Sequence, residues 1–281
     1  MSKFLETYGV AIFTLVLVAI LIAFAGPLGM KIKNATTTKV SQTEEIGSDE
    51  VYVATTGRPK PPKTAVDKVY CIYYDDGELT ISQNKIEPES GRTVVQKGFY
   101  RAPMDCTQQM TTVCFVGAVK PKSCQNWFNF CQNLTEIKNI KYLYTNECTN
   151  MNYMFRKCSS LTSLDLSGFD TSNVTTMVNI FESLNMKSLN ISNFDLSNTC
   201  SLQFMFEEIK NLDVLILGDL KFSDKTNVSK MFYTNMNANG VRRIQKVYSS
   251  QEVKDKFCTN NSYGASSTWW QQRGVEDWIV Q

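Results

Sequence analysis

Large apolar residues recur along the middle of the chain with a period close to 26 residues. Each period contains one Phe in an apolar pair, and the five pairs are Trp127-Phe128, Met154-Phe155, Ile180-Phe181, Met205-Phe206 and Met231-Phe232. Repetition at a fixed period is typical of stacked repeats, because one repeat cannot bury its apolar side alone. We therefore expect the Phe side chains to form a column, with Phe181 between Phe155 and Phe206.

The segments that precede these Phe residues alternate between apolar and polar positions. They span residues 161–166, 186–191 and 212–217. This alternation predicts short strands with one buried face, which stack in parallel about 4.8 Å apart. After each strand the period changes: Val174, Met177 and Phe181 have helical spacing, behind residues that favour helix caps. A short helix or 3₁₀ turn is expected there.

Two of the repeats resemble a known family. Residues 158–177 read Cys-Ser-Ser-Leu-Thr-Ser-Leu-Asp-Leu-Ser-Gly-Phe-Asp-Thr-Ser-Asn-Val-Thr-Thr-Met, and residues 187–197 read Lys-Ser-Leu-Asn-Ile-Ser-Asn-Phe-Asp-Leu-Ser. Both runs resemble the leucine-rich repeats of BspA-like surface proteins of bacteria. The resemblance covers about residues 124–248, and it implies a leucine-rich-repeat solenoid displayed on a bacterial cell surface.

The N-terminal segment predicts membrane insertion or export. The 24 residues between Glu6 and Lys31 carry no charge, and about 20 apolar residues span a bilayer. A retained transmembrane anchor is favoured over a cleaved signal, because the apolar core is longer than that of most signal peptides. Lysines after the segment outnumber those before it, and this charge bias would place the repeats inside the cell. We expect export because the resembling family is a surface family.

The flanking segments complete the predicted organisation. Residues 69–74 and 78–82 flank Asp75-Asp76-Gly77, a turn sequence that predicts a hairpin. Residues 241–248 and 251–257 predict a last strand and a short helix. Three Trp residues follow at positions 269, 270 and 278, and capping of the open end of the solenoid is favoured over ligand recognition for them.

The predicted fold class is a leucine-rich-repeat solenoid of short parallel strands with short helical or 3₁₀ turns, preceded by an N-terminal transmembrane helix and a small β capping unit. Five parts follow in chain order. They are a transmembrane anchor or signal segment (1–30), a Pro/Thr/Lys-rich linker (31–64), a small β unit (65–120), the repeats (121–248), and a C-terminal cap with a Trp-rich tail (249–281).

Composition argues against most enzymatic and metal sites. The chain contains no His, which excludes His-dependent nucleophilic triads and His-ligated metals. The formal net charge of +2 and the lack of long basic runs give little support for nucleic-acid binding. Adjacent carboxylates such as Glu207-Glu208 diverge in most backbone conformations. We therefore predict no enzyme activity, catalytic residue, cofactor or metal.

Two of the nine cysteines occupy one position of the repeat. Cys131 and Cys158 each lie three residues after a repeat Phe, so stacking brings them within reach of a disulfide. Later repeats have Leu184 and Ile209 at this position, which indicates a core column. Two buried thiols are favoured over a bridge.

The sequence predicts a membrane-tethered, adhesin-like protein that binds an extracellular or host protein, or a surface glycan, with its outward strand residues. The expected binding residues are Ser163, Asp165, Ser167, Lys187, Ser188, Asn190 and Ser192. The predicted location is the bacterial cell surface, with a single-pass anchor, or outside the cell if the segment is cleaved. A structural subunit of a cell-envelope or secretion assembly is the alternative. A carboxylate-based glycan hydrolase is a weaker one.

Overall fold

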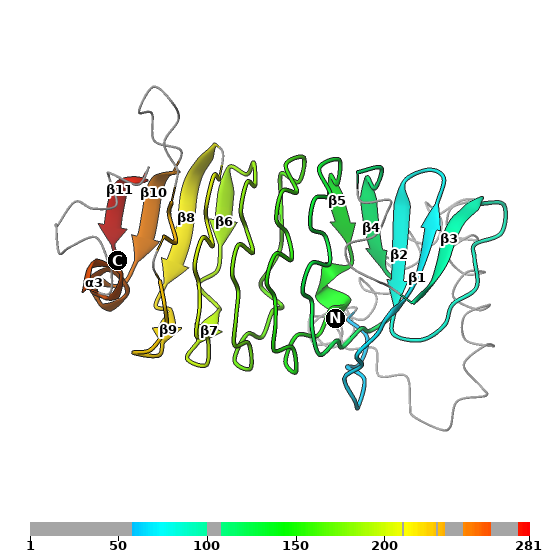
Figure 1. Ribbon diagram of the computed structural model, residues 1–281, viewed down its shortest axis with the longest axis horizontal. Helices are drawn as coiled ribbons and strands as arrows, with labels where there is room; N and C mark the ends of the chain where they lie inside the picture. The colour runs from blue at the N-terminus through cyan, green and yellow to red at the C-terminus, as the bar shows by residue number, and fades with distance from the viewer. Residues whose placement is uncertain (1–57, 100–107, 210, 229, 234–243, 260–274) are drawn as a thin grey trace, which may run out of the picture. The chain divides into compact units, whose positions relative to one another are not determined.

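The computed structural model describes residues 58–99, 108–209, 211–228, 230–233, 244–259 and 275–281 (Figure 1). Contacts divide the chain into two compact units, residues 1–51 and 52–281, and every described residue belongs to the second. This second unit is a stack of coils, each about one sequence repeat long. Its strands form a five-stranded sheet toward one end of the stack and a four-stranded sheet toward the other (Figure 1).

The five-stranded sheet is mixed and begins with the predicted hairpin. Its strands are β1 (Tyr70–Tyr74), β2 (Glu78–Ser82), β3 (Val94–Phe99), β4 (Thr112–Phe115) and β5 (Glu136–Lys138), in the order β3-β1-β2-β4-β5. β1 is antiparallel to β2 and β3, whereas β2, β4 and β5 are mutually parallel. Gly77 closes the hairpin with φ 87°, and a Cβ there would lie 2.8 Å from Thr111 Oγ1. The hairpin therefore needs glycine at this turn.

In the second half of the stack, the described strands all pair in parallel. β6 (Ser188–Asn190), β8 (Leu212–Gly218), β10 (Ile244–Ser249) and β11 (Val275–Val280) lie side by side in the order β11-β10-β8-β6 (Figure 1). The short strands β7 (Asp195–Leu196) and β9 (Lys221–Phe222) form a separate parallel pair. The 3₁₀ helix η1 (Ile140–Tyr142) follows β5, and the α-helix α3 (Gln251–Thr259) follows β10. The predicted hairpin, last strand and short C-terminal helix are thus confirmed.

Backbone hydrogen bonds on the turn side of each coil alternate between two kinds of partner. The N–H groups of Tyr153 and Phe155 donate to the carbonyls of Val178 and Ile180 in the next coil, at 2.9 and 3.1 Å. The intervening Met154 donates to the carbonyl three residues earlier, at 3.3 Å. The same alternation recurs in the neighbouring coils. Every second residue therefore joins two coils, while its neighbours tighten the turn.

This hydrogen bonding shows that the predicted fold class is wrong. The described residues form mixed and parallel sheets with few helices, and the predicted helical segment around Val174, Met177 and Phe181 contains turns and a parallel bridge at Thr176 instead of a helix. An α-helix would use its N–H groups internally and leave none for the next coil. Residues 161–166, predicted as a strand, have no strand assignment, whereas β6 and β8 match the other two predicted strands.

The predicted transmembrane helix is not found among the residues that the structure describes. Among the ranges that the structure describes, no helix has both the length and the apolar character needed to cross a bilayer. Residues 1–30, for which that helix was predicted, lie outside those ranges.

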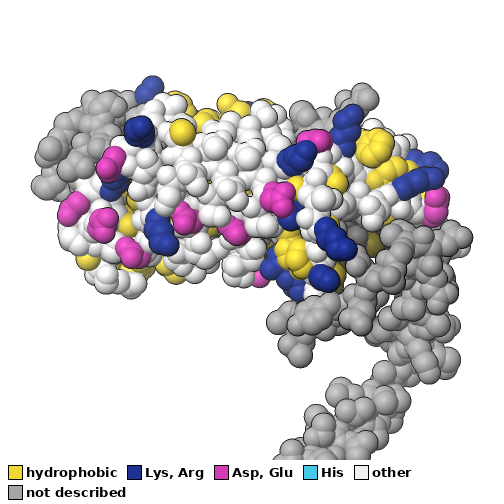
Figure 2. Space-filling model, turned by 90° about the horizontal axis from the view of Figure 1, so that it is seen from below, with side chains coloured by type: hydrophobic (Ala, Val, Ile, Leu, Met, Phe, Trp, Pro, Cys, Tyr) yellow, Lys and Arg dark blue, Asp and Glu magenta, His cyan; other side chains and the backbone are white. Residues whose placement is uncertain are grey.

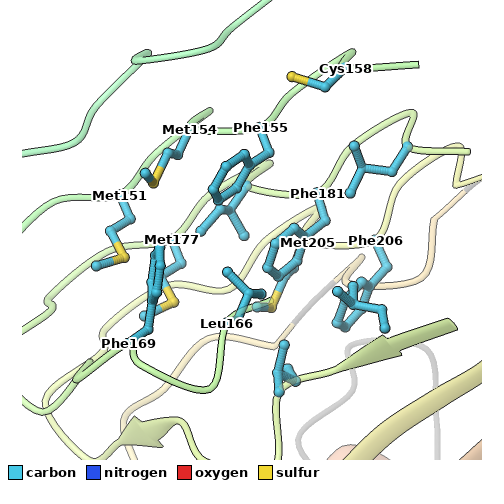
Figure 3. Close-up of a cluster of buried hydrophobic side chains, with 14 of the residues drawn as sticks. Met151, Met154, Phe155, Cys158, Leu166, Phe169, Met177, Phe181, Met205 and Phe206 are labelled. Atoms are coloured by element: carbon cyan, nitrogen blue, oxygen red, sulfur yellow. The ribbon is translucent and has the colours of Figure 1, made fainter. Parts of the chain in front are cut away.

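The predicted Phe column is confirmed and forms the centre of the core (Figure 3). Phe181 lies between Phe155 and Phe206, with ring centroids 6.1 and 5.9 Å apart and interplanar angles of 8° and 11°. The column continues through Phe128 at one end and Phe232 at the other. Because all five rings are buried, the column carries apolar contact from coil to coil.

The C-terminal end of this column is closed by aromatic side chains. The Phe232 ring lies 6.1 Å from Phe257 of α3 and 5.9 Å from Trp278 of β11. Trp278 is buried and donates its indole N–H to Ser249 Oγ at 2.8 Å. The predicted capping role is therefore confirmed for Trp278, whereas Trp269 and Trp270 lie outside the described residues.

Buried Thr hydroxyls add a second link between coils. Thr145 Oγ1 donates to the carbonyl of Asp170 at 2.9 Å and accepts the Asp170 N–H at 2.8 Å. Thr171 makes the same two bonds to Asp195 in the following coil. Each hydroxyl is satisfied as donor and acceptor, so its burial leaves no unpaired polar atom.

Part of the predicted linker lies against the repeats. The Arg58 guanidinium stacks 3.9 Å above the Tyr144 ring and donates to the Leu143 carbonyl at 3.4 Å. The Tyr144 hydroxyl donates to the carbonyl of Pro59. Arg58 and Pro59 of the predicted linker (31–64) thus pack against the first repeats.

Removal of one ring from the Phe column should strongly destabilise the fold. We expect Phe181→Ala to cost about 3–5 kcal/mol, because a large buried aromatic leaves a cavity. Thr162→Ala, at an exposed position, should stay within about 0.5 kcal/mol. Denaturant unfolding of both variants measures the difference, and similar unfolding midpoints would contradict the central role of the column.

The buried thiols should resist alkylation in the folded protein. The structure holds Cys131 and Cys158 as thiols, and burial raises the pKa of Cys158 well above its ordinary value, with Cys131 adding to the shift. The thiolate is the reactive form, so iodoacetamide should modify exposed Cys200 in the native state and Cys158 only after unfolding. Peptide mass mapping measures both. Equal native labelling of Cys158 and Cys200 would show that the coils open readily.

Candidate functional site

The seven residues predicted to bind a partner are all exposed, but several of them build turns. Asp165 Oδ1 accepts from the backbone N–H and hydroxyl of Ser167, at 3.0 and 2.6 Å. Asn190 Oδ1 accepts the N–H of Ser192 at 2.9 Å. Ser188 and Asn190 lie on β6, whereas Ser163, Asp165 and Ser167 precede it in a coil without a strand. Lys187 is exposed and lies 3.5 Å from Asp213.

A groove that the sequence did not predict crosses four successive coils on the turn side. Its volume is about 450 Å³. Two columns of side chains line it. The first column consists of Asn126, Tyr153, Asn179 and Phe204, two residues before each Phe of the core column, and the second consists of Asn129, Arg156, Glu182 and Glu207, one residue after it. We call this surface the turn groove.

The backbone of the first column is left-handed in every coil. Asn126, Tyr153, Asn179 and Phe204 have φ between 55° and 61°. Asn enters this conformation more readily than other residues with a side chain, whereas a bulky residue there is unusual. Since Asn meets the backbone requirement in two coils, Tyr153 and Phe204 are not needed for the turn itself. Their rings are half-buried on the surface of the turn groove.

A buried ion pair forms the centre of the second column. Arg156 Nε and Nη2 donate to the two carboxylate oxygens of Glu182, at 2.5 and 2.9 Å. The Glu182 side chain is only 6% exposed, and Asn179 Nδ2 donates to the same carboxylate at 2.6 Å. The guanidinium also lies 4.9 Å from the centre of the Phe130 ring. Glu182 is therefore well compensated by its neighbours.

Glu207 is much less well compensated. Asn179 Nδ2 donates to its carboxylate at 3.2 Å. Burial and the nearby charges of Glu182 and Glu208 raise the pKa of Glu207, against a smaller opposing effect of Arg156. Arg156, the cation that opposes this increase, is already paired with Glu182. This end of the turn groove has an excess of negative charge.

The other end of the turn groove has an unsatisfied hydrogen-bond acceptor. Asn129 is buried, and its Nδ2 donates to Asn126 Oδ1 at 3.0 Å. Its Oδ1 has no hydrogen-bond partner. A buried acceptor without a partner costs about 1–3 kcal/mol, so a ligand that donates a hydrogen bond there would remove that cost.

Charged residues of both signs are interspersed on the face shown in Figure 2, where a group of Lys and Arg side chains also surrounds a hydrophobic group.

Within the part of the chain that the structure describes, no cluster of three Cys, Asp or Glu residues has the arrangement of a metal site.

The repeat register contains the signal that locates the turn groove. Asn129, Arg156, Glu182 and Glu207 each follow a Phe of the column by one residue, so stacking brings them together. The apolar columns dominate the sequence pattern, in which Glu207 stands out only as the neighbour of Glu208. Comparison of polar residues at equal positions in successive repeats would have found the second column.

A comparison with protein families places the repeats. The sequence profile of the family described as "Mycoplasma protein of unknown function, DUF285" matches residues 122–269, which is more than half of the 281-residue chain. The chain belongs to this family. The DUF285 match includes all four coils that line the turn groove. No curated protein and no solved structure gave a significant match.

Loss of the buried ion pair should destabilise the coils around the turn groove. We expect Arg156→Ala to cost about 2–4 kcal/mol, because it leaves the Glu182 carboxylate buried without its cation. Lys187→Ala removes a cation from an exposed pair and should change stability by less than about 0.5 kcal/mol. Thermal and denaturant unfolding measure both. Equal losses of stability would show that burial of Glu182 does not matter.

Proposed function

We propose that this chain is a non-enzymatic binding protein of the bacterial cell surface, and that it holds an extracellular protein or glycan partner in the turn groove. The observation that carries the proposal is the occurrence of Tyr153 and Phe204 at left-handed positions where Asn suffices in other coils. Strained bulky residues at a surface are typical of functional sites.

The composition of the turn groove supports binding. Two half-buried aromatic rings, three amides, one buried ion pair and one poorly compensated carboxylate line it. Ligand sites commonly combine apolar contact area with a few well-placed polar groups. A repeat stack also suits an extended partner, because equivalent side chains recur at regular intervals along it.

The surface location rests on the sequence. Residues 158–177 and 187–197 resemble the repeats of BspA-like bacterial surface proteins, and an uncharged apolar segment lies between Glu6 and Lys31. The exposed residues from Ser163 to Ser192 that the sequence predicted form a second candidate surface, but Asp165 and Asn190 already have turn-building roles. For this reason we favour the turn groove as the binding surface.

Replacement of the two aromatic residues by Asn should weaken partner binding without unfolding the protein. Arrays of extracellular matrix proteins and of glycans, probed with the full-length chain in detergent, would identify partners. The variant Tyr153→Asn/Phe204→Asn should lose about tenfold or more in affinity for them, as expected for aromatic contacts at the centre of an interface. Its melting temperature should change little, since Asn fits the left-handed backbone.

The matched control is Phe99→Asn, which removes an exposed aromatic ring from β3, outside the turn groove. Its binding should equal that of the wild type. Loss of binding in the control but not in the double variant would place the site elsewhere. Chemical conversion of a bound partner would instead indicate an enzyme, and assembly of the chain into polymers without any partner would favour the structural-subunit alternative.

A further inference from the structure

The turn groove is lined mainly by hydrogen-bond acceptors and negative charge at its Phe204 end. Glu207 is close to the charges of Glu182 and Glu208, and Arg156, the cation that opposes them, is held in a bidentate pair with Glu182. Glu208 is exposed and accepts from Ser183 Oγ at 3.2 Å. A ligand that complements this end should bring a positive charge and hydrogen-bond donors.

The aromatic ring beside these carboxylates also attracts cations. The ammonium group of Lys230, from the next coil, lies 5.4 Å from the centre of the Phe204 ring and 5.7 Å from that of Tyr233. Such distances are typical of cation–π contacts. The Phe204 ring thus already contacts a cation of the chain itself, and the Glu207 and Glu208 carboxylates are the groups that attract a ligand cation here.

We propose, as an extension of the proposed function, that the turn groove binds a protein segment through a Lys or Arg side chain, whose cation contacts the Glu207 and Glu208 carboxylates beside the Phe204 ring. The occupant is an extended basic peptide, and charge complementarity distinguishes it from a neutral glycan. A neutral sugar would supply donors but would leave the negative charge of Glu207 uncompensated.

The two ends of the turn groove together suit an extended segment. Asn129 and Glu207 lie three coils apart, which is about 14 Å at the spacing of parallel strands. About four residues of extended peptide cover this distance. A backbone N–H of the segment can then satisfy Asn129 Oδ1 while the cation lies at Glu207.

Binding of a lysine peptide should depend on Glu207 specifically. The probe is a fluorescein-labelled hexalysine peptide, titrated with the full-length chain in detergent at low salt and followed by anisotropy. Glu207→Gln should weaken binding about tenfold, and Glu208→Gln should weaken it less because Glu208 is exposed. The matched control Glu252→Gln, an exposed carboxylate on α3, should stay within about twofold. Non-specific electrostatic attraction between hexalysine and the chain is not expected, because the chain has a formal net charge of +2.

The pH dependence provides a second readout on the same variants. As the pH falls through the raised pKa of Glu207, its carboxylate is protonated and the peptide should dissociate. Four other charged residues face this region: Glu182, Glu208, Arg156 and Lys230. They are present in both the wild type and Glu207→Gln. The difference between the wild type and Glu207→Gln therefore isolates Glu207, and the variant should show the flatter pH profile.

The outcomes separate this inference from the proposed function. Equal affinity of wild type and Glu207→Gln for hexalysine would overturn the inference, as would equal binding of a fully acetylated hexalysine. If a neutral oligosaccharide binds, and Tyr153→Asn/Phe204→Asn removes it, the site is correct and the basic occupant is wrong. If the aromatic variant binds every partner like the wild type, the proposed function itself fails.

Discussion

The backbone hydrogen bond between one coil and the next is the interaction on which the rest of this structure depends. Every second N–H on the turn side donates to the following coil, and the residues between them close the turn upon themselves. Each coil is therefore held on both sides, and its apolar side chains are forced into register with those above and below. The Phe column and the paired Thr hydroxyls follow from that register.

The same alternation determines which side chains reach the surface. A turn that directs alternate N–H groups to its neighbour needs left-handed residues at fixed positions, and none of those in the first column is Gly. The side chains at these positions project outward in line, coil after coil. The turn groove is thus a direct product of the backbone arrangement, and the chain varies its chemistry by changing one residue per coil at each position.

Much of the stack could be predicted from the sequence because apolar spacing reports the repeat directly. The Phe column, the hairpin around Gly77 and the cap formed by Trp278 follow from periodicity and turn chemistry. The turns after the strands could not be read in this way. Val174, Met177 and Phe181 have helical spacing, but they face inward from successive turns, and the N–H groups of Met177 and Phe181 bond to the next coil. Periodicity records which residues are buried and not where their backbone hydrogen bonds go.

The candidate site was less predictable for a related reason. Exposed polar residues on a predicted strand look available in a sequence, yet Asp165 and Asn190 are engaged in local turns. Arg156 and Glu182 lie 26 positions apart, and only the stacking of coils makes them an ion pair. Such a pair becomes visible when the repeats are aligned by their Phe residues and the polar columns are compared as carefully as the apolar ones.

The stacking of like coils has a consequence for how such a protein can change in length. The hairpin sheet lies at one end of the described stack, and α3 with β11 lies at the other. A whole coil can be duplicated or lost between them, since each interior coil meets only its two neighbours. The turn groove would then grow or shrink by one residue in each column. The length of the turn groove is thus adjustable in steps of one repeat, with the end units unchanged.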